Sequence, residues 1–114
     1  MQLNEPNPPL AESMDRADLR AAAFLAKALA DENRARIIRS LSEGKKSVSS
    51  LVEELAISQP LASHHLKELK RALLVVVERE GPFVYYDLAD RRVAAILADM
   101  GELAADLLTN RTSF

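Results

Sequence analysis

The segment from Ser58 to Lys70 constrains the fold most, because its residues repeat with the period of an α-helix and separate into two faces. Apolar residues recur at positions i, i+4, i+7 and i+11, namely Ala62, Leu66, Leu69 and Leu73. This spacing predicts one buried face. The opposite side carries polar side chains, namely Gln59, Ser63, Lys67 and Lys70. An outer face with short hydrogen-bonding groups and few cations suits the DNA major groove, where base edges must be approached closely.

A second helix is predicted just before this one. Ser47 is a suitable N-cap, and apolar residues follow it at helical spacing, namely Val48, Leu51, Val52 and Leu55. Only residues 56–57 then precede Ser58, which caps the next helix. Pro60 fits its first turn, where a missing N–H costs nothing. Two helices joined this tightly, the second with a polar outer face, predict a helix-turn-helix.

The pattern changes after Leu74 to two runs of β-branched and aromatic residues, 75–80 and 83–88. The loop between them, Gly81-Pro82, opens with Gly, which predicts a type II′ hairpin with a positive φ at Gly81. Pairing Glu80 with Phe83 sets the register, with Val77 opposite Tyr86, Val75 opposite Leu88 and Arg79 opposite Val84. A hairpin directly after a helix-turn-helix predicts a wing. We expect Phe83 and Tyr85 to cover the edge of the core, and stacking on a DNA sugar is the alternative.

Three more helices complete the predicted fold. An Ala-rich helix runs from about Asp15 to Ala30, capped by Asp15 or Ser13, and Asp31 caps another that ends before a left-handed Gly44. The last helix, about 90–109, has a wide apolar stripe. Because the body and wing can close a core by themselves, the apolar faces of the first and last helices predict a homodimer with a four-helix seam. The alternative is that both helices fold back onto their own domain.

The length of 114 residues, 48% of them hydrophobic, predicts one domain with a modest core. Residues 1–12 are Pro-rich without apolar periodicity, so we expect a flexible arm. Residues 13–110 then form a DNA-binding and dimerisation domain, and 111–114 a tail. The fold class is mainly α with a small β-hairpin, α+β, as a winged helix-turn-helix.

Charge and composition exclude several functions. The net charge of −2 means that DNA binding must rest on local charge, and residues 58–86 hold four cations against three carboxylates. The absence of Cys excludes disulfides and thiolate metal sites on this chain. No apolar run has the length of a membrane span and no secretory signal is visible, so we expect a cytoplasmic protein without a membrane partner.

From about Leu29 to Leu108 the chain resembles the ArsR/SmtB-type family of small winged-helix repressors. The resemblance rests on three stretches: Leu29-Ala30-Asp31-Glu32-Asn33-Arg34-Ala35-Arg36-Ile37-Ile38, the helix from Ser58-Gln59 to His64-His65-Leu66, and Arg79-Glu80-Gly81 leading into Val84-Tyr85-Tyr86. It implies a homodimeric repressor that covers a promoter and releases it when an inducer binds. Most characterised members sense metals or thiol-reactive species.

The positions at which this family holds metals are changed. Thiolate sensors carry Cys-x-Cys at the start of the third helix, where this chain has Ser47 and Ser49. The other site, an Asp-x-His followed by His-x-x-His or His-x-x-Glu in the last helix, corresponds to Asp90, Arg92, Leu103 and Asp106. Because both imidazoles are gone and Arg92 would repel a cation, we expect no metal at these sites and no cofactor.

The family pattern and the helical geometry imply a set of DNA-binding residues, namely Ser58, Gln59, Pro60, Ser63, His64, Lys67 and Arg79. Base contacts are expected from Gln59, Ser63 and His64. Ser58 caps the helix, whose N-terminal amides are expected to face a phosphate. Lys67 and Arg79 are expected to bind backbone phosphates. Ordinary solvated charge is the alternative for each cation.

Three further departures concern the ends of elements. Ala56 and Leu73 stand where relatives usually have Gly, so a left-handed backbone would cost roughly 1 kcal/mol at each. Pro82 occupies a wing-tip position that is often basic in relatives, which predicts a weaker phosphate contact.

The neighbouring histidines predict no metal or catalytic site. On a helix, His64 and His65 point about 100° apart and do not chelate together, so we expect His65 to pack against a neighbouring helix while His64 points outward. Ser63 forms no catalytic dyad with His64 for the same reason, and three glycines offer no phosphate-cradling loop. We therefore expect no enzyme.

The sequence predicts a sequence-specific DNA-binding regulator, a repressor that binds an inverted repeat as a homodimer. Two alternatives remain open. A winged-helix module could bind a protein instead, as the acidic balance and uncharged wing tip suggest. A repressor could also sense a small organic molecule between its first and last helices.

Overall fold

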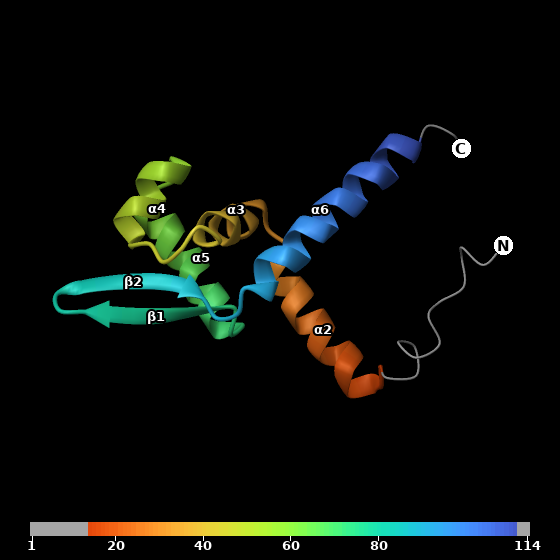
Figure 1. Ribbon diagram of the computed structural model, residues 1–114, viewed down its shortest axis with the longest axis horizontal. Helices are drawn as coiled ribbons and strands as arrows, with labels where there is room; N and C mark the ends of the chain where they lie inside the picture. Colours follow the sequence, from red (N-terminus) through yellow and green to blue (C-terminus); the bar gives the residue numbers. More distant parts are fainter. Residues whose placement is uncertain (1–13, 112–114) are drawn as a thin grey trace.

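The computed structural model describes residues 14–111, which form five helices and one β-hairpin. In chain order these are α2 (Arg16–Leu29), α3 (Glu32–Leu41), α4 (Val48–Leu55), α5 (Gln59–Arg71), β1 (Val75–Glu80), β2 (Phe83–Leu88) and α6 (Arg92–Asn110). Helices α3, α4 and α5 gather with the hairpin on one side, whereas α2 and α6 diverge on the other (Figure 1). The predicted order of elements is confirmed. The predicted arm, Ser13 and residues 112–114 lie outside the described part.

Local capping explains where the helices begin. The Asp15 carboxylate accepts the Asp18 N–H at 2.9 Å, and the Asp18 carboxylate accepts the Asp15 N–H at 3.2 Å, which makes a capping box at α2. The other predicted caps accept a backbone N–H in the same way, namely Asp31 at α3, Ser47 at α4 and Ser58 at α5. Gly44 has φ +137°, which favours Gly but lies outside the left-handed helical region that we predicted.

The core lies under α3 and α5. Its fully buried large side chains come from four elements, namely Ile37, Ile38, Leu41, Leu51, Leu66, Leu69 and Val75. The prediction that Leu73 joins the buried face of α5 is wrong, since its side chain is 76% exposed. The helix ends at Arg71 and Leu73 has φ +68°, which turns the chain so that Leu74 is buried instead. Ala56 has φ +54°, so the backbone is left-handed at both positions where relatives usually have Gly, and the strain considered for that case applies.

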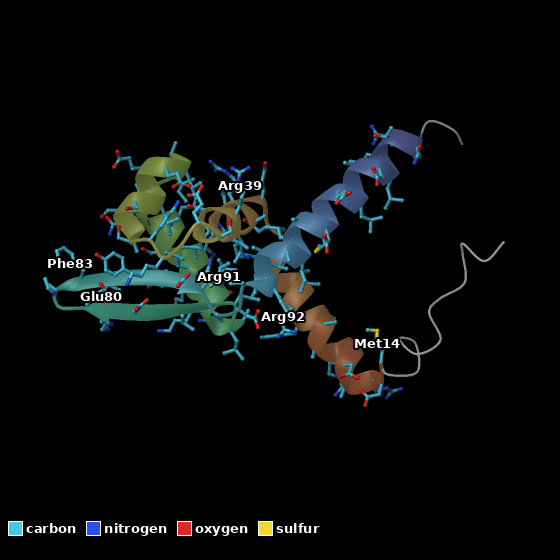
Figure 2. The ribbon with its side chains drawn as sticks, viewed as in Figure 1. Met14, Arg39, Glu80, Phe83, Arg91 and Arg92 are labelled. Atoms are coloured by element: carbon cyan, nitrogen blue, oxygen red, sulfur yellow. The ribbon has the colours of Figure 1, made fainter. Side chains whose placement is uncertain are left out.

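The hairpin has the predicted register, with Glu80 paired to Phe83, Val77 to Tyr86 and Val75 to Leu88. Gly81 has the predicted positive φ, +60°. The expectation that Phe83 covers the core edge is wrong, because Phe83 is 61% exposed and lies at the tip of the wing (Figure 2). At that distance from the helices the ring finds no core to cover. Tyr85, nearer the body, is half-buried.

Helices α2 and α6 keep most of their apolar side chains exposed. Only Leu29 of α2 and Val93 of α6 are buried. Their exposed large side chains include Leu19, Phe24, Leu25, Ile96, Met100, Leu103, Leu107 and Leu108. The alternative that both helices fold back onto their own domain is therefore wrong for this chain. Within residues 14–111, no helix combines the length and the apolarity that a membrane span requires.

Candidate nucleic-acid interface

Helix α5 carries six of the seven predicted DNA-binding residues on its outer side. Ser58 is the N-cap, Gln59 and Pro60 form the first turn, and Ser63, His64 and Lys67 follow in the next two turns, all exposed. The opposite face is buried against the core and holds Ala62, His65, Leu66 and Leu69. The seventh residue, Arg79, lies on β1 and is also exposed. The helix presents these polar groups because its apolar residues are fixed inward.

The first turn of α5 has little spare hydrogen-bonding capacity. The Ser58 hydroxyl accepts the Leu61 N–H at 3.2 Å, and the Ser58 carbonyl accepts the Ala62 N–H at 2.9 Å. Pro60 has no N–H to offer. Of the amides that we expected to face a phosphate, only the N–H of Gln59 is therefore left to donate to one. The positive end of the helix dipole lies at the same place and also favours an anion.

The charges around this surface are arranged asymmetrically. Within residues 14–111, Lys67 and Arg79 form no ion pair, whereas every carboxylate of α5 and β1 has a cationic partner. Glu68 binds Arg71 at 2.8 Å, and the two glutamates of β1 bind Lys45. The unpaired cations can therefore attract phosphate without a competing neighbour, although the chain as a whole is acidic.

The two neighbouring histidines have the predicted separate environments. His65 is 5% exposed, with its Nδ1 3.4 Å from Nη1 of Arg34 and its Nε2 3.7 Å from Oδ1 of Asp31. Burial lowers the pKa of His65, and the adjacent Arg34 acts in the same direction, while Asp31 opposes them. His64 is exposed, and the ring centroids of the two residues are 5.2 Å apart. His65 therefore positions α5 while His64 faces outward.

The positions that correspond to metal sites have other roles. Ser47 caps α4, and its hydroxyl donates to Oγ of Ser50 at 3.1 Å. Arg92 binds Asp90 through its guanidinium at 2.9 Å and through its backbone N–H at 2.8 Å. These bonds lower the pKa of Asp90 to about 2. No group of three or more His, Cys, Asp or Glu side chains in the described residues could hold a metal ion. Arg92 and its neighbour Arg91 lie where the hairpin meets α6 (Figure 2).

Two lysines in the loop between α3 and α4, which were not among the predicted site residues, contact the wing. The Lys46 N–H donates to the Tyr86 carbonyl at 2.9 Å, and the Tyr86 N–H donates back at 2.8 Å, so the loop pairs with β2. Lys45 binds the glutamates of β1. Two lysines between a helix-ending Gly and an N-cap Ser resemble ordinary surface charge, so no local pattern indicated this role.

Known proteins resemble this chain in both sequence and structure. Residues 31–76 match the family model for "bacterial regulatory protein, arsR family". The HTH-type transcriptional repressor SmtB of Mycobacterium tuberculosis is 44% identical over 94 residues, which cover 82% of this chain and 66% of that repressor. The HTH-type transcriptional regulator MJ1325 of Methanocaldococcus jannaschii, described as uncharacterized, is 39% identical over 83 residues, which cover 72% of this chain and 93% of that protein.

A solved structure agrees with both matches. The homodimeric winged helix-turn-helix DNA-binding domain of Mb0332 from Mycobacterium bovis, described as a possible ArsR-family transcriptional regulator, superposes with a TM-score of 0.69. It is 33% identical, and the match covers 83% of this chain and 89% of that domain. The predicted resemblance is confirmed. With its winged helix-turn-helix and these identities, the chain belongs to the arsR family of bacterial regulatory proteins.

Proposed function

We propose that this protein is a sequence-specific DNA-binding transcriptional repressor and not an enzyme. The single observation that carries the proposal is the outer face of α5, where uncharged hydrogen-bonding side chains are exposed beside cations that form no ion pair within the described part of the chain. Short neutral donors and acceptors can reach base edges, whereas cations hold the phosphates and set the register of the helix on the duplex.

In this proposal, Gln59, Ser63 and His64 contact bases in the major groove. Gln can pair bidentately with adenine, and a Ser hydroxyl can donate or accept. Lys67 on the helix and Arg79 on the wing bind backbone phosphates on either side of the groove. The N–H of Gln59, at the positive end of the helix dipole, adds a further phosphate contact.

The protein is proposed to act as a homodimer through α2 and α6. These two helices expose a long apolar surface that a second copy would cover, and the Mb0332 relative is described as homodimeric. A twofold axis would place two copies of α5 about one DNA turn apart, which suits an inverted repeat. Residues 13–110 would then serve as one unit for dimerisation and DNA binding, and a protein that regulates transcription in this way would work in the cytoplasm.

The repressor is proposed to work without the metal sites that its resemblance implies. Ser47 is committed to capping α4, and Arg92 already occupies the Asp90 carboxylate. The cavity of about 190 Å³ between α2 and α6 is lined by apolar side chains, namely Ala22, Leu25, Ala26, Leu29, Leu74, Val93, Ile96 and Met100. Because it lies on the proposed seam, we assign it to side chains of the second copy.

Selection of bound fragments from a random DNA pool tests the proposal. The expected result is an inverted repeat whose half-sites are about 10 base pairs apart, bound with an affinity that falls steeply as salt rises. A matched duplex with scrambled half-sites serves as the control. If no sequence is enriched and no saturable complex forms at low salt, the proposal fails, and a winged-helix module that binds a protein becomes the better explanation.

A further inference from the structure

The loop between α3 and α4 connects the helical body to the wing through two adjacent lysines, Lys45 and Lys46, here called the lysine pair. Lys46 exchanges two backbone hydrogen bonds with Tyr86, at 2.9 and 2.8 Å, and so forms an isolated antiparallel bridge to β2. Successive side chains of an extended backbone point in opposite directions. The two ammonium groups therefore reach different parts of the molecule.

Lys46 is anchored in the helical body. Its Nζ donates to the Ser40 hydroxyl of α3 at 2.8 Å, and to the carboxylates of Glu43 and Glu54, both at 2.6 Å. Ser40 in turn donates to Glu54 at 2.5 Å. The hydrogen bonds that Lys46 donates to Glu43 and Glu54 raise its pKa, so the ammonium stays charged. This end of the lysine pair is held by groups from α3, α4 and the loop itself.

Lys45 is anchored on the wing. Its Nζ lies 3.5 Å from Glu78, forms a closer ion pair with Glu80, and stands 5.2 Å from the centre of the Tyr85 ring. The hydrogen bond that Lys45 donates to Glu80 is the main cause that raises the pKa of Lys45. Glu80 lies at the tip of the wing, beside Phe83 (Figure 2). One cation thus holds three side chains on one face of the hairpin.

This arrangement matters because of the charge of β1. Glu78, Arg79 and Glu80 together carry one excess negative charge, which would repel a phosphate backbone. Lys45 pairs with both carboxylates on their face of the hairpin and offsets one of their two negative charges. Arg79 alternates to the other face, where it has no ion-pair partner in the described residues. With Lys45 included, the charges of Lys45, Glu78, Arg79 and Glu80 sum to zero, and the wing approaches DNA with an accessible cation.

We propose that Lys45 is a positioning residue for DNA binding: it pairs with Glu78 and Glu80, offsets the excess negative charge of β1 and holds the wing against the helical body, so that Arg79 reaches a phosphate, without touching DNA itself. The inference rests on the proposed function. Part of the affinity for DNA that the wing supplies would then depend on a lysine in the loop between α3 and α4, far from α5 in the sequence.

A double-mutant cycle tests the proposal with the operator recovered from the selection. Lys45→Gln is expected to raise the operator Kd roughly three- to tenfold. In the Glu78→Gln/Glu80→Gln background the same change should alter Kd less than about twofold, since the carboxylates that Lys45 pairs with are gone. Equal losses in both backgrounds would mean that Lys45 contacts DNA directly, and no loss in either would mean that it does nothing for binding. Each of these results overturns the proposal.

A second measurement needs no DNA, so it separates this proposal from the proposed function. The chain has two Tyr and no Trp, and both Tyr lie on β2, so their ring resonances report on the wing. Lys45→Gln should shift the Tyr85 ring signals and speed amide hydrogen exchange in β1 and β2 roughly fivefold or more. Lys70→Gln, which removes a lysine of α5 that has no ion-pair partner among residues 14–111, is the matched control and should change neither. An unchanged wing in Lys45→Gln contradicts the proposal even if no operator is ever found.

Discussion

The guanidinium Nη1 of Arg34 lies 3.4 Å from Nδ1 of His65, the buried histidine of α5. The same guanidinium donates from Nε to the Ala28 carbonyl at 2.5 Å and from Nη2 to the Lys27 carbonyl at 3.4 Å. Both carbonyls belong to the last turn of α2, where the helix dipole is negative and favours a cation. Arg34 therefore joins a helix of the proposed dimer seam to the helix proposed to read DNA.

Replacing Arg34 should lower the stability of the protein. Arg34→Gln removes the donors to the Ala28 carbonyl and His65, which is expected to lower the free energy of unfolding by about 1–3 kcal/mol. Urea denaturation measures this change. Arg20→Gln, at an exposed position of α2 without a hydrogen bond or ion pair in the described residues, is the control and should have little effect. Equal stability of the two variants would show that the Arg34 contacts contribute nothing net.

Acidification should destabilise the fold through His65. Burial lowers its folded-state pKa below the usual 6.5, so the unfolded chain binds the proton more readily. This contribution to stability is complete above about pH 6.5 and is lost as the pH falls toward the lowered folded-state value. Unfolding free energies measured from pH 7.5 to 5 should show the decline.

His65→Gln should flatten this decline, because no buried imidazole is left to protonate. His64→Gln, which removes the exposed neighbouring imidazole, should leave the decline in stability at low pH unchanged. If the slope survives in His65→Gln, another group causes the pH dependence.

Base contact and phosphate contact should be separable on α5. Gln59→Ala is expected to cost about 1–3 kcal/mol on the operator and very little on random DNA. Lys67→Ala should weaken binding to both duplexes and reduce the salt slope by about 1. Fluorescence anisotropy at several salt concentrations measures these effects, and Ser49→Ala on α4 is the control. Similar losses for Gln59→Ala on operator and random DNA would remove its base-reading role.

A charge within the apolar stripe of α6 should prevent dimerisation. Leu103 is exposed in the protomer, so Leu103→Glu leaves the core of the domain intact but would bury a carboxylate in the proposed seam. Sedimentation at micromolar concentration should show a dimer for the original chain and a monomer for the variant. Asp99→Asn, which alters a polar position of the same helix, should remain dimeric. A monomeric original chain would contradict the proposed dimer.

Relief of backbone strain at Leu73 should stabilise the protein. Its φ of +68° is unfavourable for a side chain with a Cβ, and the side chain buries little surface. Leu73→Gly is therefore expected to raise the free energy of unfolding by about 1 kcal/mol. Ala30→Gly, at φ −84°, tests the same substitution type where no strain exists and should not stabilise. Thermal or urea unfolding of the two variants distinguishes these outcomes.

Local features of the sequence predicted most of the fold. Asp31 and Ser58 cap their helices by accepting an N–H three residues ahead, so the cap and its partner can be read together. The register of the wing follows from the two-residue loop at Gly81, because pairing must begin with the residues on either side of it. The exposed face of α5 could be predicted because apolar spacing fixes which side of a helix is buried.

The two predictions that are wrong concern residues at the end of a helix and at the tip of the hairpin. Leu73 fits the α5 repeat by spacing, but the helix stops two residues earlier and the backbone turns left-handed. Phe83 lies on the mixed face of the wing, but the hairpin extends beyond the helices at that point and the ring covers no core. Both outcomes depend on where neighbouring elements end, which a repeat does not record.

The sequence by itself determined the elements, their order, the wing register and the exposed polar face of α5, since each depends on residues close together in the chain. Only the tertiary structure decided the contacts of Lys45 and Arg34. Lys45 finds its carboxylates 33 and 35 residues away, and Arg34 meets His65 across 31 residues. A charged side chain matches many partners equally well in a sequence. Which partner it meets is settled when packing of the core brings two distant segments within reach of each other.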